Sequence, residues 1–152
     1  MKISHVLFLF AALVIASCGK KKVQLKANPE KYALTHPDSV NKKVIESYSG
    51  TIPCADCEGI KTTLNFYADN TFLMEDIYLG KNSTPFRSTG HYNIERGYGK
   101  DNNASLFVLN DSIPEKKKFY VRYSAKPNRL FMLDRDAKPI QSKMEFVLKR
   151  LE

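Results

Sequence analysis

The chain has 152 residues, of which 43% are hydrophobic, 11% aromatic and 26% charged, and its formal net charge is +8. This size fits one globular domain with additional segments, and the composition excludes a collagen-like, low-complexity or wholly disordered chain. Neither a Gly-rich phosphate-binding fingerprint nor the His-Glu-x-x-His pattern of zinc proteases occurs in the sequence, which excludes the common nucleotide-binding and metalloprotease classes.

Residues 1–17 are predicted to be a cleaved signal peptide. Lys2 supplies a positive start, and residues 6–15 form an uninterrupted apolar run. This run is half of the roughly 20 residues that a membrane-spanning helix needs. Residues 15–18, Ile-Ala-Ser-Cys, resemble the lipobox of bacterial lipoproteins, so Cys18 is expected to be lipidated. The alternative is ordinary cleavage after residue 16 or 17 with an incidental cysteine.

Residues 18–43 are predicted to be a flexible tether, because they are rich in Lys, contain two prolines and hold few large apolar side chains. Acyl chains on Cys18 would anchor the protein stably without a spanning helix. In enteric bacteria, an Asp directly after the lipidated Cys retains lipoproteins in the inner membrane. Gly19 does not match that signal, so the outer membrane is the expected location.

After residue 43 the hydrophobic pattern takes a period of two, which is typical of strands with one buried face. Eight strands are predicted, at residues 44–52, 60–67, 71–79, 85–95, 106–110, 118–124, 129–133 and 143–151. Their connections are short, so consecutive strands are expected to be antiparallel neighbours. Residues 44–152 are therefore predicted to form an all-β, antiparallel up-and-down barrel of eight strands, with a two-sheet sandwich as the alternative.

The alternation also predicts which side chains face the interior of the sheet. The second strand buries one face and exposes the other, and the fourth and eighth repeat this pattern. The predicted inward residues are Ile60, Thr62, Leu64, Phe66, Phe86, Ser88, Gly90, Tyr92, Ile94, Met144, Phe146 and Leu148. His91 is expected on the outer surface.

The chain contains three cysteines, and assigning Cys18 to lipid leaves Cys54 and Cys57 as one Cys-x-x-Cys pair. Export places this pair in an oxidising compartment, where a disulfide is the default state unless a metal holds the thiols reduced. One interpretation is a structural or regulatory disulfide that pins the first turn, with Pro53 and Gly59 supplying fixed and permissive backbone angles.

Two further interpretations of Cys54 and Cys57 stay open. Two thiolates suit Cu(I), whereas the nearby Asp56 and Glu58 suit harder ions. No spacing selects a further soft or imidazole ligand from His36, His91, Met74, Met132 and Met144. Redox exchange is the third interpretation, and it is disfavoured because the pair lies in a loop and does not open a helix that would lower a thiol pKa.

The segment 48–60 closely resembles the N-terminal domain of the NlpE-type envelope lipoproteins, a copper resistance and homeostasis family. The matching residues are Tyr48, Gly50, Ile52, Pro53, Cys54, Ala55, Asp56, Cys57, Gly59 and Ile60. The resemblance implies an outer-membrane lipoprotein with a lipocalin-like β-barrel, associated with copper tolerance and with signalling of envelope stress. The longest members carry a second, OB-like domain with its own cysteines, which these 152 residues do not include, so functions of that domain are not carried over.

The predicted function is a lipid-anchored protein of envelope copper homeostasis or stress sensing that acts through Cys54 and Cys57. Its expected partners are the membrane, a copper ion and an envelope signalling protein. No Ser-His-Asp or paired-carboxylate constellation is suggested by the spacing, so no enzymatic activity is expected. Lys116 to Lys118 are interpreted as a solvated hairpin end, not a nucleic-acid site. The alternative function is a lipocalin-like module that binds a small apolar ligand in a cavity of about 300 Å³ or more.

Overall fold

A computed structural model describes residues 42–152 of the chain. These residues form eight strands and one short 3-10 turn. In chain order they are β1 (Val44–Ile52), β2 (Gly59–Tyr67), β3 (Thr71–Leu79), β4 (Phe86–Tyr98), β5 (Asp101–Leu109), η1 (Pro114–Lys116), β6 (Lys118–Arg122), β7 (Arg129–Met132) and β8 (Val147–Arg150). The predicted signal peptide, Cys18 and almost all of the predicted tether lie outside the described residues.

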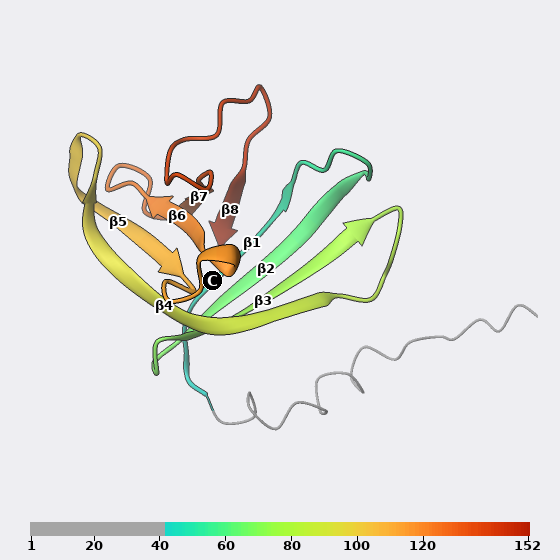
Figure 1. Cartoon of the computed structure of the whole chain (residues 1–152), viewed down its shortest axis with the longest axis horizontal. Helices are drawn as coiled ribbons and strands as arrows, with labels where there is room; N and C mark the ends of the chain where they lie inside the picture. The colour runs from blue at the N-terminus through green and yellow to red at the C-terminus, as the bar shows by residue number, and fades with distance from the viewer. Residues whose placement is uncertain (1–41) are drawn as a thin grey trace, which may run out of the picture. The chain divides into compact units, whose positions relative to one another are not determined.

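The strands form a closed barrel in the order β1 to β8, and every neighbouring pair is antiparallel (Figure 1). The barrel closes where β1 meets β8, through the pairs Tyr48 with Arg150 and Ser49 with Lys149. The predicted up-and-down eight-stranded barrel is confirmed, and the two-sheet alternative is wrong. Short connections explain this order, since a strand that follows a tight turn pairs most readily with the strand before it.

The centre of the barrel is filled by side chains. Phe66 lies at the middle of this core, with ring centroids 4.7 Å from Tyr92 and 4.9 Å from Phe107. The buried cluster consists of Tyr48, Leu64, Phe66, Phe72, Met74, Tyr92, Phe107, Leu109, Tyr120, Leu130 and Leu148. Burial of these aromatic and aliphatic side chains is the main favourable contribution to folding.

A second apolar cluster lies on the other face of the sheet, which the sequence did not predict. Ala104, Val121 and Leu133 form its buried part, and several half-buried aromatic side chains, including Tyr123 and Phe131, pack against it. The strands β5, β6 and β7 therefore bury side chains on both faces. This explains why Leu106 to Leu109 read as a continuous apolar run without alternation.

Several predicted strand boundaries and faces differ from the structure. β5 begins at Asp101 and not at residue 106, and β8 begins at Val147 and not at residue 143. Phe86, Ile94 and Met144 were predicted to face inward, yet they are 57%, 45% and 60% exposed. Met144 belongs to the long connection between β7 and β8, and Phe86 and Ile94 lie on β4 to either side of the buried Tyr92.

Because neighbouring strands are antiparallel, the connections gather in two sets. The segments 53–58, 80–85, 110–117 and 133–146 connect the strands at one end of the barrel. The segments 68–70, 99–100 and 123–128 connect them at the other end, where β1 also begins after Lys43. Within residues 42–152, no helix has the length and apolar character that crossing a bilayer requires.

Candidate functional site

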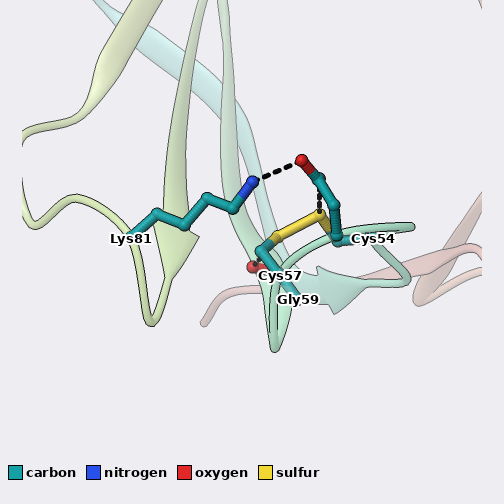
Figure 2. The surroundings of a disulfide bond; sticks show 5 residues. Cys54, Cys57, Gly59 and Lys81 are labelled. Carbon is teal, nitrogen blue, oxygen red and sulfur yellow. Dashed lines mark hydrogen bonds and ion pairs between the residues drawn. A yellow bond between two sulfur atoms is a disulfide. The ribbon is translucent and has the colours of Figure 1, made fainter.

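Cys54 and Cys57 lie in the connection between β1 and β2, with their Cα atoms 5.4 Å apart, and they are joined by a disulfide (Figure 2). β1 ends at Ile52, and Pro53, which cannot donate a ladder hydrogen bond, follows it directly. Both cysteines are half-buried, while Ala55 and Asp56 between them are exposed. The pair is thus carried at the surface of the loop, at the barrel end opposite to the start of β1.

Gly59 allows the chain to return from this loop into β2. Its φ angle is +148°, and an added Cβ atom would lie 2.6 Å from Cγ2 of Thr51. Both conditions favour glycine, because L side chains rarely adopt this backbone conformation. The nitrogen of Glu58 donates a hydrogen bond to the carbonyl oxygen of Leu79, 3.2 Å away, which ties the loop to β3.

Each sulfur atom has an oxygen atom close to it. Sγ of Cys54 lies 3.5 Å from Oδ1 of Asp56, and Sγ of Cys57 lies 3.3 Å from the carbonyl oxygen of Gly59. Disulfide sulfurs carry no proton, so these contacts are not hydrogen bonds in the oxidised protein. In the reduced protein, the same two oxygen atoms would accept hydrogen bonds from the two thiols.

Lys81, from the connection between β3 and β4, forms an ion pair with Asp56 (Figure 2). Its hydrogen bond and its positive charge lower the pKa of the Asp56 carboxyl below the ordinary value of 3.8. The side chains are 46% and 76% exposed, so solvent screens this pair strongly. The pair holds a carboxylate beside Cys54, and nothing in the sequence spacing pointed to Lys81.

The structure brings together three of the predicted candidate ligands and separates the others. Ligand atoms of Cys54, Asp56 and Cys57 all lie within 4.8 Å of one another, the one such group of His, Cys, Asp or Glu among the described residues. Glu58 is not part of it. His91 is exposed on β4, Met74 is in the core, and His36 lies outside the described residues.

Comparison with known proteins now identifies the family. Residues 48–143 match the model of the NlpE N-terminal domain. The chain belongs to the NlpE N-terminal domain family.

Lipoprotein NlpE of Escherichia coli K12 is 38% identical over 107 residues, which cover 70% of this chain and 41% of that protein. The chain therefore spans less than half of the length of this relative. A solved lipoprotein from Shewanella oneidensis, 33% identical, covers 68% of this chain and 85% of its own with a TM-score of 0.52. The E. coli structure, described as the Cpx pathway activator NlpE, is 34% identical over 70% of this chain and 51% of its own, with a TM-score of 0.47.

Two of the residues that match the NlpE motif are structural. Tyr48 is fully buried in the core. A Cβ atom on Gly50 would lie 2.6 Å from the carbonyl oxygen of Val147 and 3.2 Å from Cα of Leu148, so glycine is needed where β1 and β8 close the barrel. Only the part of the motif from Cys54 to Cys57 is left as a candidate for chemistry in this NlpE-family barrel.

The hydroxyl group of Tyr48 belongs to a half-buried polar network that the sequence analysis did not identify. Tyr48 donates a hydrogen bond of 2.8 Å to the Glu46 carboxylate and accepts one of 2.9 Å from Arg122. Arg122 also donates to both carboxylate oxygens of Glu46, at 2.9 and 2.6 Å. Glu46 and Tyr48 are two residues apart on β1, so their side chains share one face of the strand. This spacing was the sequence signal that could have indicated their contact.

Proposed function

We propose that this chain is a lipid-anchored envelope protein that senses envelope stress through the Cys54–Cys57 pair and has no catalytic role of its own. The observation that carries this proposal is the exposed loop, in which a disulfide and a carboxylate are held together. The E. coli relative is described as an activator of the Cpx pathway. By its sequence similarity to that protein, we infer that the output of this chain is also an envelope signalling pathway.

The stimulus that fits this donor set best is copper. The disulfide does not bind a metal ion, so a thiol reductant must first supply two electrons and two protons to give two thiols. Two thiolates from Cys54 and Cys57 are soft ligands that suit Cu(I). Asp56, whose ligand atom lies within 4.8 Å of both sulfurs, is a hard ligand and would complete the site less strongly.

A copper titration tests this part of the proposal. The reduced full chain is titrated with Cu(I) under anaerobic conditions against a chromogenic Cu(I) chelator. We expect uptake of one equivalent, lost in the Cys54→Ser/Cys57→Ser variant. Asp56→Asn is the matched control within the same loop, and it should weaken binding by less than tenfold. Equal uptake by the native chain and the double variant would eliminate thiol coordination.

The anchor is a separate part of the proposal. Residues 15–18 support acylation of Cys18, and Gly19 supports transport to the outer membrane. Mass spectrometry of the native N-terminal peptide should show two or more acyl chains on Cys18, and membrane fractionation should place the protein with the outer membrane. An unmodified N-terminus would overturn the anchor, whatever the outcome of the copper titration.

The alternative of a small apolar ligand inside the barrel has little support. The centre of the barrel is filled by Phe66, Tyr92 and Phe107, which are at most 7% exposed. A cavity of 480 Å³ exists to one side of this core, but polar and charged side chains form much of its lining. This cavity is therefore a different kind of site from the apolar pocket of a lipocalin.

A further inference from the structure

The 480 Å³ cavity exists because β4 changes partners along its length. Its first half, residues 86–91, pairs with β3, and its second half, residues 92–98, pairs with β5. The first half therefore has a strand neighbour on one side only among the described residues. The connection 110–117, including η1, crosses this gap, and Figure 1 shows η1 near the middle of the ring of strands.

The cavity has a built wall. A Cβ atom on Gly90 would lie 1.9 Å from Oδ1 of Asn110, so the side chain of Asn110 occupies the space that glycine leaves free. The amide group of Asn110 donates a hydrogen bond of 3.3 Å to the carbonyl oxygen of Lys116. The backbone nitrogen of Asn110 donates a second hydrogen bond, of 2.8 Å, to the carbonyl oxygen of His91. These contacts fix η1 to the open edge of β4.

The floor of the cavity is apolar and its rim is polar. Phe72 and Met74, which are 2% and 1% exposed, provide the floor from β3. The hydroxyl-bearing residues Ser88 and Thr89 line the side formed by β4, together with Arg87, whose guanidinium is paired with Glu75 at 2.7 Å. The volume lies within the range of about 300 to 1,000 Å³ that small-molecule sites occupy.

Two lysines give the cavity its chemical character. The ammonium group of the half-buried Lys118 lies 3.7 Å from Sδ of Met74. A thioether sulfur is a weak hydrogen-bond acceptor. Sδ of Met74 also accepts a hydrogen bond of 3.7 Å from the hydroxyl group of the buried Tyr120. Among residues 42–152, no carboxylate lies within 4.0 Å of the ammonium group of Lys118 or Lys116.

We propose that this cavity binds a small amphipathic carboxylate. The carboxylate would accept charge-assisted hydrogen bonds from Lys118 and Lys116, and the apolar part would lie on Phe72 and Met74. Glu115 also lines the cavity, so two lysines that have no carboxylate partner within residues 42–152 face one acidic side chain, and the balance favours a monoanion. This site is independent of the cysteine pair and goes beyond the proposed sensing function.

Octanoate is a suitable probe, because it is a soluble carboxylate with a short apolar chain. Binding is followed on the full chain in lipid nanodiscs by ¹³C-methyl methionine NMR, with empty nanodiscs titrated in parallel. The methyl group of Met74 reports the cavity floor, and that of Met144, which is 60% exposed in another loop, is the internal control. We expect a saturable shift of the Met74 signal and none of the Met144 signal.

Variants and related probes make the test specific. Lys118→Gln should weaken octanoate binding at least tenfold, while Lys118→Arg keeps the charge and should retain it. Lys100→Gln makes the same change in net charge in the exposed turn between β4 and β5 and should have no effect. Uncharged octanol should bind at least tenfold more weakly than octanoate. The Cys54→Ser/Cys57→Ser variant should bind octanoate as the native chain does.

Three results would overturn the proposal. The first is an absent or non-saturable Met74 shift with octanoate. The second is equal binding of octanol and octanoate, which would show that the lysines do not select the ligand. The third is binding of octyl phosphate without binding of octanoate, which would reassign the site to phosphate monoesters.

Discussion

The two ends of the barrel each contain a carboxylate paired with a cation, and the two pairs differ in burial. Glu46 and Arg122, near the end where β1 begins, are 20% and 21% exposed and share a hydrogen-bonded network with Tyr48. Asp56 and Lys81, at the disulfide end, are 76% and 46% exposed. The first pair is largely shielded from water, so each charged side chain depends on the other for its hydrogen bonds. The second is screened by solvent and contributes little to stability.

This difference in burial gives the two ends of one small domain different roles, because one end contributes to stability and the other presents groups for chemistry. The end that holds Glu46 contains a half-buried network whose polar groups are satisfied by one another. The disulfide end leaves its distinctive groups accessible to reductants, metal ions and partners. A loop on a rigid scaffold is a common location for functional residues, because its changes do not disturb the core.

Loss of Arg122 should have the largest effect on stability. Arg122→Met leaves the Glu46 carboxylate and the Tyr48 hydroxyl without their shared donor in a half-buried site. We expect the free energy of unfolding to fall by about 3 kcal/mol, near the lower limit for breaking a buried ion pair. Urea unfolding measures this, and the Glu46→Gln/Arg122→Met double variant should recover part of the loss. A loss below about 0.5 kcal/mol would place this network with ordinary surface pairs.

A methyl group at Gly50 should cost slightly less. Gly50→Ala forces a Cβ atom against the carbonyl oxygen of Val147, at the seam where β1 and β8 close the barrel. Backbone at both sides limits relaxation, so we expect a loss of about 2 kcal/mol in urea unfolding. Gly99→Asn is the control, because that turn is open and its φ of +59° suits asparagine. Equal losses in both variants would contradict the close approach.

The pH dependence of stability should also distinguish the two ends. Burial raises the pKa of Glu46, but hydrogen bonds from Arg122 and Tyr48 and the charges of Arg122 and Arg150 outweigh this, so the pKa lies below 4.5. Its contribution is therefore fully present above pH 4.5 and is lost as the pH falls through the lowered pKa. Glu46→Gln should flatten the loss of stability between pH 5 and 3, whereas Asp56→Asn should change it much less. Parallel curves for all three proteins would be inconsistent with this assignment.

Much of the fold was predictable because local pattern and topology agree. The bounds of β1 and β3 match the predicted strands, since Pro53 directly follows β1 and the turn residues Asp69 and Gly80 flank β3. The start of β5 was missed because Asp101, Asn102 and Asn103 have turn-like side chains, yet all three belong to β5, and Asp101 pairs with Tyr98 across a turn that contains Gly99. Pairing within the hairpin of β4 and β5 overrode local propensity there.

The candidate site was predictable only in part. Cys54, Asp56 and Cys57 are adjacent in sequence, so their proximity needed no knowledge of the fold. Lys81 is 25 residues away from Asp56, and only the pairing of β2 with β3 brings its loop to the cysteines. Lys118 and Met74, 44 residues apart, meet only because the barrel closes around them. Spacing in a single sequence contains no information about such contacts.

Removal of the disulfide should have a smaller effect on stability than the loss of Arg122. The cysteines are three residues apart, so the bond closes a very short loop. The chain-entropy model limits its stabilisation to about 2 kcal/mol, and we expect Cys54→Ser/Cys57→Ser to lose no more than this in urea unfolding. The core around Phe66 should be unaffected, as shown by unchanged near-ultraviolet circular dichroism. Complete unfolding of the variant would show that the pair is a structural requirement.

Replacement of Lys81 should have the smallest effect on stability, but it should slow the reaction of the reduced cysteines with an alkylating reagent. Lys81→Met should leave the midpoint of urea unfolding unchanged within the error of the measurement, because the ion pair with Asp56 is exposed and screened by solvent. It also leaves the negative charge of Asp56 uncompensated 3.5 Å from Sγ of Cys54, which disfavours the thiolate. Alkylation of the reduced pair by iodoacetamide at pH 7 should therefore slow several-fold, while Lys100→Met, the same substitution in an exposed turn, should leave the rate unchanged. If both variants react at the native rate, Lys81 has no influence on the cysteines, and the ion pair in Figure 2 only joins two loops.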